Sequence, residues 1–216
     1  MADGRDLDRQ RIEVERSVDA AARDAQQQIQ AYQQRLRVGL LERAADPRSL
    51  PDTSLTRTLV AATRVAVALM WVQNAFWKVP PDFGRDRKDD LYRFVQHAVE
   101  HPVLPPYSWV VEHVVLPNFT FFGWTTLLVE ASLGAFLLIG LATRFWALVG
   151  VGQSTAIALS VLNTPGEWHW SYYLMIVAHL ALFAVAAGRA GGLDGVLRPR
   201  WSASSGRVAA VMVRAS

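Results

Sequence analysis

Four long apolar segments constrain this chain more than any other feature of its sequence. A membrane-spanning helix needs about 20 mostly apolar residues, because each residue adds about 1.5 Å against about 30 Å of hydrocarbon. The segments that meet this requirement cover residues 58–77, 119–142, 145–162 and 168–188. We therefore predict an all-α fold, with a four-transmembrane-helix antiparallel bundle within residues 51–188.

The connections between these segments order the bundle. Residues 143–144 join the second and third segments, and residues 163–167, with Pro165 and Gly166, join the third and fourth. Turns this short force neighbouring helices to run antiparallel. The bias of Lys and Arg toward one set of loops, together with a charged N-terminus that lacks a signal-peptide pattern, places both termini in the cytoplasm. We expect a multi-pass protein of the inner (plasma) membrane of a bacterium.

The loop between the first two segments, residues 79–118, is too long to be a bare connection. Its first half repeats apolar residues at helical spacing, and a second amphipathic stretch follows three prolines. These apolar residues are Leu91, Phe94, Val95, Ala98 and Val99, then Trp109, Val110, Val114 and Val115. We predict two short helices that cap the bundle on the extracytoplasmic membrane surface.

The N-terminal segment, residues 1–50, is predicted to be a cytoplasmic helix from about Leu7 to about Arg43. Apolar residues alternate four and three apart in it, as in a coiled-coil seam. They are Val18, Ala22, Ala25, Ile29, Tyr32, Leu36 and Gly39. Two interpretations stay open: a solvated amphipathic helix that lies on the protein's own cytoplasmic face, or a docking helix for a partner or a second copy. The docking residues would be Val18, Ile29, Tyr32 and Leu36.

Composition excludes several functions. The chain has no cysteine, so it has no disulfides, thiolate zinc sites or self-ligated iron–sulfur clusters. A net charge of +3 is too small to suggest nucleic-acid binding. Residues 189–216 carry five arginines and one acid, Asp194, and are predicted to be a cationic cytoplasmic tail.

Each apolar segment contains a polar residue in its inner half or middle: Arg64, Glu130, Gln153 and His179, in chain order. Charged groups within hydrocarbon are costly unless paired, so each is a functional hypothesis. We predict an Arg64–Glu130 ion pair with Gln153 and His179 within hydrogen-bonding range. This network either fixes helix register or forms a midplane pocket or proton relay. Alternatively, Arg64 snorkels to the interface and leaves Glu130 protonated or paired with His179.

Other candidate sites are weaker. His97 and His101 are four residues apart beside Glu100, a spacing that puts two imidazoles on one helix flank, and Glu112 and His113 could join them. A solvated helix edge is the simpler interpretation, so no metal site is predicted. The sequence has no glycine-rich phosphate loop and no serine or threonine with an evident base partner, and catalytic residues stay unknown.

The four-segment region, from about Thr58 to Leu197, resembles the DoxX/DoxD-like family of small bacterial membrane proteins. Arg64 lies near the start of the first segment, which ends in residues 75–78, similar to the family's Gly-x-x-Lys. Glu130 and Gly134 match the glutamate and glycine of its second helix, and residues 140–144 match its terminal Gly-Leu-x-Thr-Arg. Residues 191–194, Gly-Gly-Leu-Asp, form a turn of the same style.

This resemblance implies a four-helix bundle whose signature positions are Arg64, Lys78, Glu130 and Arg144. It also implies a link to redox physiology, since some members resemble the small subunit of a thiosulfate:quinone oxidoreductase and others look like membrane anchors for redox enzymes. The chain departs from the family pattern at Ala75, where a glycine is expected, in its longer first loop and in its extra N-terminal helix.

Three functions follow from these observations. The first is a redox-associated or respiratory membrane subunit, with no intrinsic cofactor but with a midplane pocket for a quinone. The second is a non-catalytic accessory or scaffold subunit of a larger membrane complex, docked through the N-terminal helix. The third is a proton-coupled transporter of small molecules, which ranks last because the segments lack the broken helices and internal repeats of transporter sites.

Overall fold

The computed structural model describes residues 21–34 and 53–216, and every element within these two ranges is helical. Since neither range contains a strand, the predicted all-α class holds for the part of the chain that is described. The chain divides into two units, Met1–Ser49 and Leu50–Ser216.

In the first unit, residues 21–34 form a helix whose side chains are all exposed. One pair four residues apart supports it, because Gln28 donates to Asp24 at 3.1 Å. This part of the predicted N-terminal helix is confirmed. The rest of the predicted range from Leu7 to Arg43 lies outside the described residues.

The second unit begins with α2, whose N-cap Thr53 accepts a hydrogen bond from the backbone N–H of Thr56 at 3.1 Å. Its elements are α2 (Ser54–Phe76), α3 (Asp90–Glu100), α4 (Pro105–Val110), the π-helical turn η1 (Val111–Val115), α5 (Phe119–Ile139), α6 (Thr143–Val161), α7 (His169–Ala184), the 3-10 turn η2 (Ala187–Arg189), α8 (Leu193–Ser202) and α9 (Arg207–Ala215). Helices α2, α5, α6 and α7 coincide with the four predicted apolar segments. α7 ends four residues earlier than predicted, because Ala186 adopts a left-handed conformation and the chain continues as η2.

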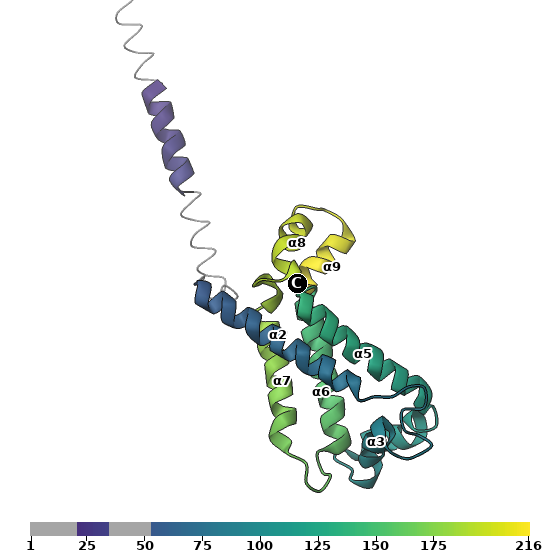
Figure 1. Cartoon of the computed structure of the whole chain (residues 1–216). Coiled ribbons are helices and arrows are strands. Elements are labelled where there is room, and N and C mark those ends of the chain that lie inside the picture. Colours follow the sequence, from purple (N-terminus) through teal and green to yellow (C-terminus); the bar gives the residue numbers. More distant parts are fainter. Residues whose placement is uncertain (1–20, 35–52) are drawn as a thin grey trace, which may run out of the picture. The chain divides into compact units, whose positions relative to one another are not determined.

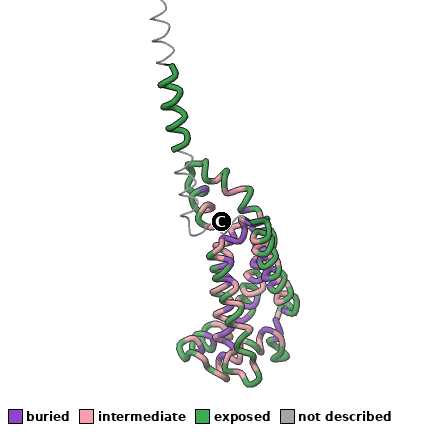
Figure 2. The backbone as a smooth tube through the Cα atoms, turned by 90° about the vertical axis from the view of Figure 1, so that its left-hand side faces the viewer, coloured by how far each residue is buried: buried purple, intermediate pink, exposed green. Residues whose placement is uncertain are grey.

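Two of the described helices, α2 and α5, are long and apolar enough to cross a membrane, and α7 is apolar but shorter. In their most apolar stretches, 22% of the α2 residues and 28% of the α5 residues are buried. A core helix of a soluble protein would be mostly buried, whereas these helices carry exposed residues along their length (green in Figure 2). The exposed large apolar side chains on α2, α5, α6 and α7 include Leu59, Leu69, Phe121, Leu128, Leu148, Leu174, Val177 and Leu180. A surface of this kind is stable against lipid.

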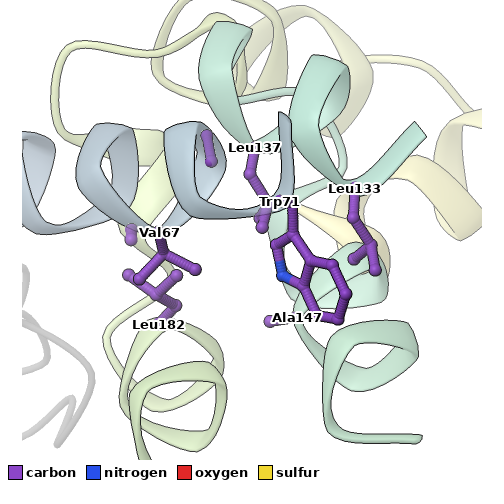
Figure 3. Close-up of a cluster of buried hydrophobic side chains, with 8 residues drawn as sticks. Val67, Trp71, Leu133, Leu137, Ala147 and Leu182 are labelled. Carbon is purple, nitrogen blue, oxygen red and sulfur yellow. The ribbon is translucent and has the colours of Figure 1, made fainter. Parts of the chain in front are cut away.

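The main hydrophobic core lies where α2, α5, α6 and α7 meet. The indole of Trp71 projects from α2 toward Ala147 of α6, with Leu133 of α5 beside it (Figure 3). Val67 and Leu182 join α2 to α7 in the same cluster. Trp71 is 1% exposed, so this one side chain fills the space between three helices. Helix α5 ends just beyond the core, where Gly140 takes a φ of 68° that favours glycine.

The cap between α2 and α5 consists of α3, α4 and η1, and both predicted amphipathic stretches are therefore helical. Leu91 of α3 packs with Phe83 and Phe119 in a second buried cluster. The Tyr107 hydroxyl of α4 donates to the carbonyl of Ala156 at 3.1 Å, and the Asn163 amide donates to the carbonyl of Pro102 at 2.9 Å. These bonds hold the cap against the C-terminal end of α6.

The predicted tail of residues 189–216 contains α8 and α9. The Asp194 carboxylate accepts from the backbone N–H groups of Ala142 at 2.7 Å and Thr143 at 2.9 Å, at the start of α6. Arg198 donates to the carbonyl of Val213 and so joins α8 to the end of α9. Figure 1 shows α8 and α9 at the end of the helices opposite α3.

A close contact locks α6 to α7 and α2. A Cβ placed on Gly150 of α6 would lie 2.0 Å from Cδ2 of His179, so the imidazole rests directly on the glycine backbone. The same His179 accepts a hydrogen bond from Trp71 Nε1 at 2.8 Å. Gly152, on the same helix, has no atom within 4 Å of such a Cβ.

We expect Gly150→Ala to lower the free energy of unfolding in detergent by about 1–3 kcal/mol, because the added methyl group must displace a buried ring. Gly152→Ala is the matched control and should be neutral or stabilising by up to about 1 kcal/mol, since alanine is the better helix former. Thermal unfolding followed by circular dichroism would compare the two. Equal melting temperatures for the two variants would contradict the close contact of His179 with Gly150.

Candidate functional site

A cavity of about 380 Å³ lies between the C-terminal end of α2, the cap and helices α5, α6 and α7. Its walls are mainly apolar, and Phe94, Val111, Phe122 and Ile157 are among the side chains that form them. Lys78, Glu130 and Gln153 also line it, and they come from three separate parts of the chain. The cavity therefore combines mainly apolar walls with a small set of converging polar groups, which is typical of ligand sites.

A buried ion pair forms the polar part of this cavity. Lys78 Nζ lies 2.6 Å from Glu130 Oε2, and both side chains are 1% exposed. The ammonium group also donates to the carbonyl of Asn74 at 2.7 Å and lies 4.2 Å from the ring centroid of Trp77. On the other side, Gln153 Nε2 donates to Glu130 Oε1 at 3.2 Å. Each charge is thus compensated by neighbours, as a charge in apolar surroundings requires.

The predicted Arg64–Glu130 ion pair is wrong, because the register of α2 against α5 differs from the one assumed. A Cβ on Gly134 would lie 2.7 Å from Val72, so these two positions are side by side. One turn farther toward the start of α5, Glu130 comes level with the end of α2 and meets Lys78. Arg64 lies two turns away in the opposite direction. The predicted contact between Gln153 and Glu130 is confirmed.

Arg64 instead satisfies the C-terminal end of α5. Its guanidinium donates to the carbonyls of Leu137, and of Leu138 at 2.7 Å, and more weakly to that of Gly191 at 3.4 Å. The last carbonyls of a helix have no partner within the helix and carry its negative dipole end, which favours a cation there. Arg64 is 2% exposed and acts as a structural tie between α2, α5 and the turn before α8.

His179 does not join the Glu130 network either. Its Nε2 accepts from Trp71, so its Nδ1 carries the proton and donates to the carbonyl of Met175 at 2.6 Å. Both ring nitrogens of this buried residue are satisfied, which identifies a neutral core histidine. Arg144 also lies apart from the cavity, with its guanidinium carbon 4.4 Å from the ring centroid of Phe183.

Two tyrosines that line the cavity and one aspartate that caps a helix were not predicted from the sequence. Tyr107 and Tyr172 line the cavity, and burial raises the pKa of Tyr107. Tyr172 donates to the carboxylate of Glu167 at 2.5 Å. Asp194, which is fully buried, caps α6 from α8. The sequence feature that could have identified Asp194 is its position as the single acid among the five arginines of residues 189–216.

The other predicted residues lie outside the cavity. His97, Glu100 and His101 come together at the C-terminal end of α3, where His101 is the C-cap, whereas Glu112 and His113 lie apart from them on η1. Burial lowers the pKa of His97, and the hydrogen bond from Arg93 lowers the pKa of Glu100. Of the predicted docking residues, Ile29 and Tyr32 are exposed, and Val18 and Leu36 lie outside the described residues.

Comparison with known proteins gives one match. A protein-family model described as "TQO small subunit DoxD" matches residues 90–215, which is more than half of the chain. The matched range contains Glu130 and Gln153 and begins after Arg64 and Lys78. No curated protein and no solved structure matches the chain.

We expect Lys78→Met to lower the free energy of unfolding by about 3–5 kcal/mol, because it leaves the Glu130 carboxylate buried without its counter-charge. The double variant Lys78→Met/Glu130→Leu should recover much of this loss, since both charges are removed together. Thermal unfolding in detergent measures both, and Lys88→Met, at an exposed lysine of the same loop, is the control. A double variant as unstable as the single one would refute the pairing.

Proposed function

The chain belongs to the DoxD family, and we propose that it is a membrane subunit of a redox or respiratory complex whose cavity takes the head group of a quinone. The observation that carries this proposal is the Lys78–Glu130–Gln153 cluster in a largely apolar cavity. A buried ion pair is a poor source of stability, because desolvation of the two charges offsets their attraction. Ionisable groups in a membrane protein that are held at this cost are candidates for function.

The proposed topology has four membrane spans, α2, α5, α6 and α7, in the bacterial plasma membrane, with both termini cytoplasmic. Support comes from the outward apolar faces of these helices and from the short connection between α6 and α7. The 16 residues of α7 cover about 24 Å, and η2 extends the path. The cap would then lie on the extracytoplasmic side. The arginines of residues 189–216 would face the cytoplasmic leaflet, whose lipids are anionic.

A quinone head group fits the chemistry of the cavity. When bound, a quinone accepts two electrons and two protons on its ring oxygens. The Lys78 ammonium and the Gln153 amide are hydrogen-bond donors suited to a carbonyl oxygen. The Glu130 carboxylate can accept and release a proton beside them. The apolar walls, including Phe94 and Phe122, provide flat contacts for a ring and for an isoprenoid tail. Electrons would come from a partner protein, since the chain has no cysteine for its own iron–sulfur cluster.

Glu130→Gln and Gln153→Leu are expected to lower quinone binding at least about tenfold. The first removes the negative charge that pairs with Lys78, and the second removes the amide donor; a hydrogen bond to a charged group contributes about 1.5–3 kcal/mol. The measurement is titration of the full chain in detergent with decylubiquinone. Gln73→Leu is the matched control, because Gln73 is exposed on α2 and does not line the cavity.

Wild-type protein that binds no decylubiquinone would overturn the quinone proposal. So would a Gln73→Leu variant that loses as much affinity as Gln153→Leu. Circular dichroism of each variant confirms that the helices remain folded before binding is compared.

The exposed side chains of Ile29 and Tyr32 favour a second candidate function, an accessory or scaffold subunit. Large apolar side chains on an exposed helix are common at protein interfaces. In this case residues 1–50 dock a protein partner or a second copy, and the polar cluster has a structural role. Purification in mild detergent, with mass spectrometry of the proteins and lipids that remain bound, distinguishes the two candidates.

Deletion of residues 1–45 should release the protein partner while the membrane helices keep their melting temperature, because these residues belong to a separate unit. Co-purification before and after the deletion measures the effect, and Ile29→Ser/Tyr32→Ser tests the same surface without shortening the chain. A complex that stays assembled in both variants would rule out docking through this helix.

A further inference from the structure

The last turn of α3 gathers three side chains that are common metal ligands. His97, Glu100 and His101 are spaced i, i+3 and i+4, so they lie on one flank of the helix. One ligand atom from each lies within 4.8 Å of the other two. The two imidazole rings stack at 28°, with their centroids 5.9 Å apart.

One ring nitrogen in this cluster makes no hydrogen bond. Nδ1 of His97 is buried and makes no hydrogen bond to any described residue. The side chain of His97 is 17% exposed and that of Glu100 is 41% exposed, so the cluster lies partly buried at the edge of the helix. A buried polar nitrogen without a partner is costly, and a bound ligand would remove that cost.

The distances suit a small divalent ion. Nδ1 of His97 lies 3.6 Å from Oε2 of Glu100. Zinc binds nitrogen and oxygen ligands at about 2.0–2.2 Å, so two ligands at a tetrahedral angle are about 3.4 Å apart. The His97 and Glu100 atoms are therefore already close to the separation of two ligands on one zinc ion. The widest pair, at 4.8 Å or less, needs a closure of at most about 1.4 Å, which side-chain rotation can provide.

Neighbouring contacts orient these ligands. Arg93 Nη1 holds Oε1 of Glu100 at 2.6 Å, which leaves Oε2 for the side of His97. The bond from Asn163 to the Pro102 carbonyl fixes the chain just after His101. Such outer contacts around metal ligands set their orientation and contribute to affinity.

We propose that His97, Glu100 and His101 bind one divalent transition-metal ion of the zinc class. Imidazole and carboxylate ligands suit Zn²⁺ and its neighbours in the first transition row rather than Ca²⁺ or Mg²⁺. Three protein ligands leave a fourth position for water. Leu91, Phe94 and Val95 of the same helix line the cavity, so the ion would stiffen one of its walls. The metal site does not depend on the quinone proposal.

The chain contains its own matched control. His113 and Glu112 are also neighbouring metal-ligand types in the cap, but both are exposed, with side chains 51% and 57% accessible. Nδ1 of His113 already pairs with the carbonyl of Trp109 at 2.9 Å. The described residues place no third ligand beside this pair.

The test is competition for Zn²⁺ between the full-length chain in detergent, stripped with EDTA, and a chromogenic chelator. We expect one Zn²⁺ per wild-type chain, with affinity at least about tenfold lower in His97→Ala and in His101→Ala, and unchanged in His113→Ala. Glu100→Gln, at an exposed position where folding is little affected, should also weaken binding. Co²⁺ in place of Zn²⁺ should give the visible absorption of a tetrahedral site in the wild type.

Absence of Zn²⁺ binding at micromolar concentration would overturn the proposal. Equal losses in His113→Ala and His97→Ala would do so as well, since they would indicate adventitious binding to surface histidines. If either alanine variant of the site loses its helical circular dichroism, the Glu100→Gln result decides.

Discussion

Every polar group that this fold places among apolar helices has to find its partner inside the protein, because lipid offers none. At one end of the helices, Arg64 donates hydrogen bonds to the last carbonyls of α5, and Asp194 accepts hydrogen bonds from backbone N–H groups at the start of α6. At the other end, Lys78 and Glu130 compensate each other beside Gln153. The first group closes the helix ends and needs no ligand. The second group borders a cavity, and on that difference we base the proposal that it has a functional role.

The sequence predicted the elements from α2 to α7 well, because their signals are local. Apolar length indicated α2, α5, α6 and α7, and helical periodicity followed by prolines indicated α3 and α4. The predicted partner of Glu130 was wrong, since it depended on how α2 and α5 align. Two helices of similar length can slide by one or two turns without any change in composition, and the contact of Gly134 with Val72 that fixes the alignment is visible only in the structure. Asp194 was missed for a related reason: its partners lie about 50 residues earlier in the chain.

The match to the DoxD family covers only part of the chain that forms the cavity. The family match covers α3 to α9, a range that contains Glu130. Lys78, the charge partner of Glu130, lies just after α2 and precedes the matched range. The site is therefore assembled from a part that the family match describes and a part that it leaves open. The additional helix over residues 21–34 belongs to a separate unit and presents its own exposed surface.

The seat of His179 on Gly150 also determines how a molecule can reach the cavity. Helices α2, α6 and α7 interlock through Trp71, His179 and the glycine backbone, so they cannot separate without exposing a buried indole. The cap is held to α6 by a few side-chain hydrogen bonds, among them those of Tyr107 and Asn163. These hydrogen bonds can break without moving the interlocked helices. A lipid-soluble molecule would therefore enter laterally, between the cap and the bundle, and the rate of that opening would set how fast the cavity fills and empties.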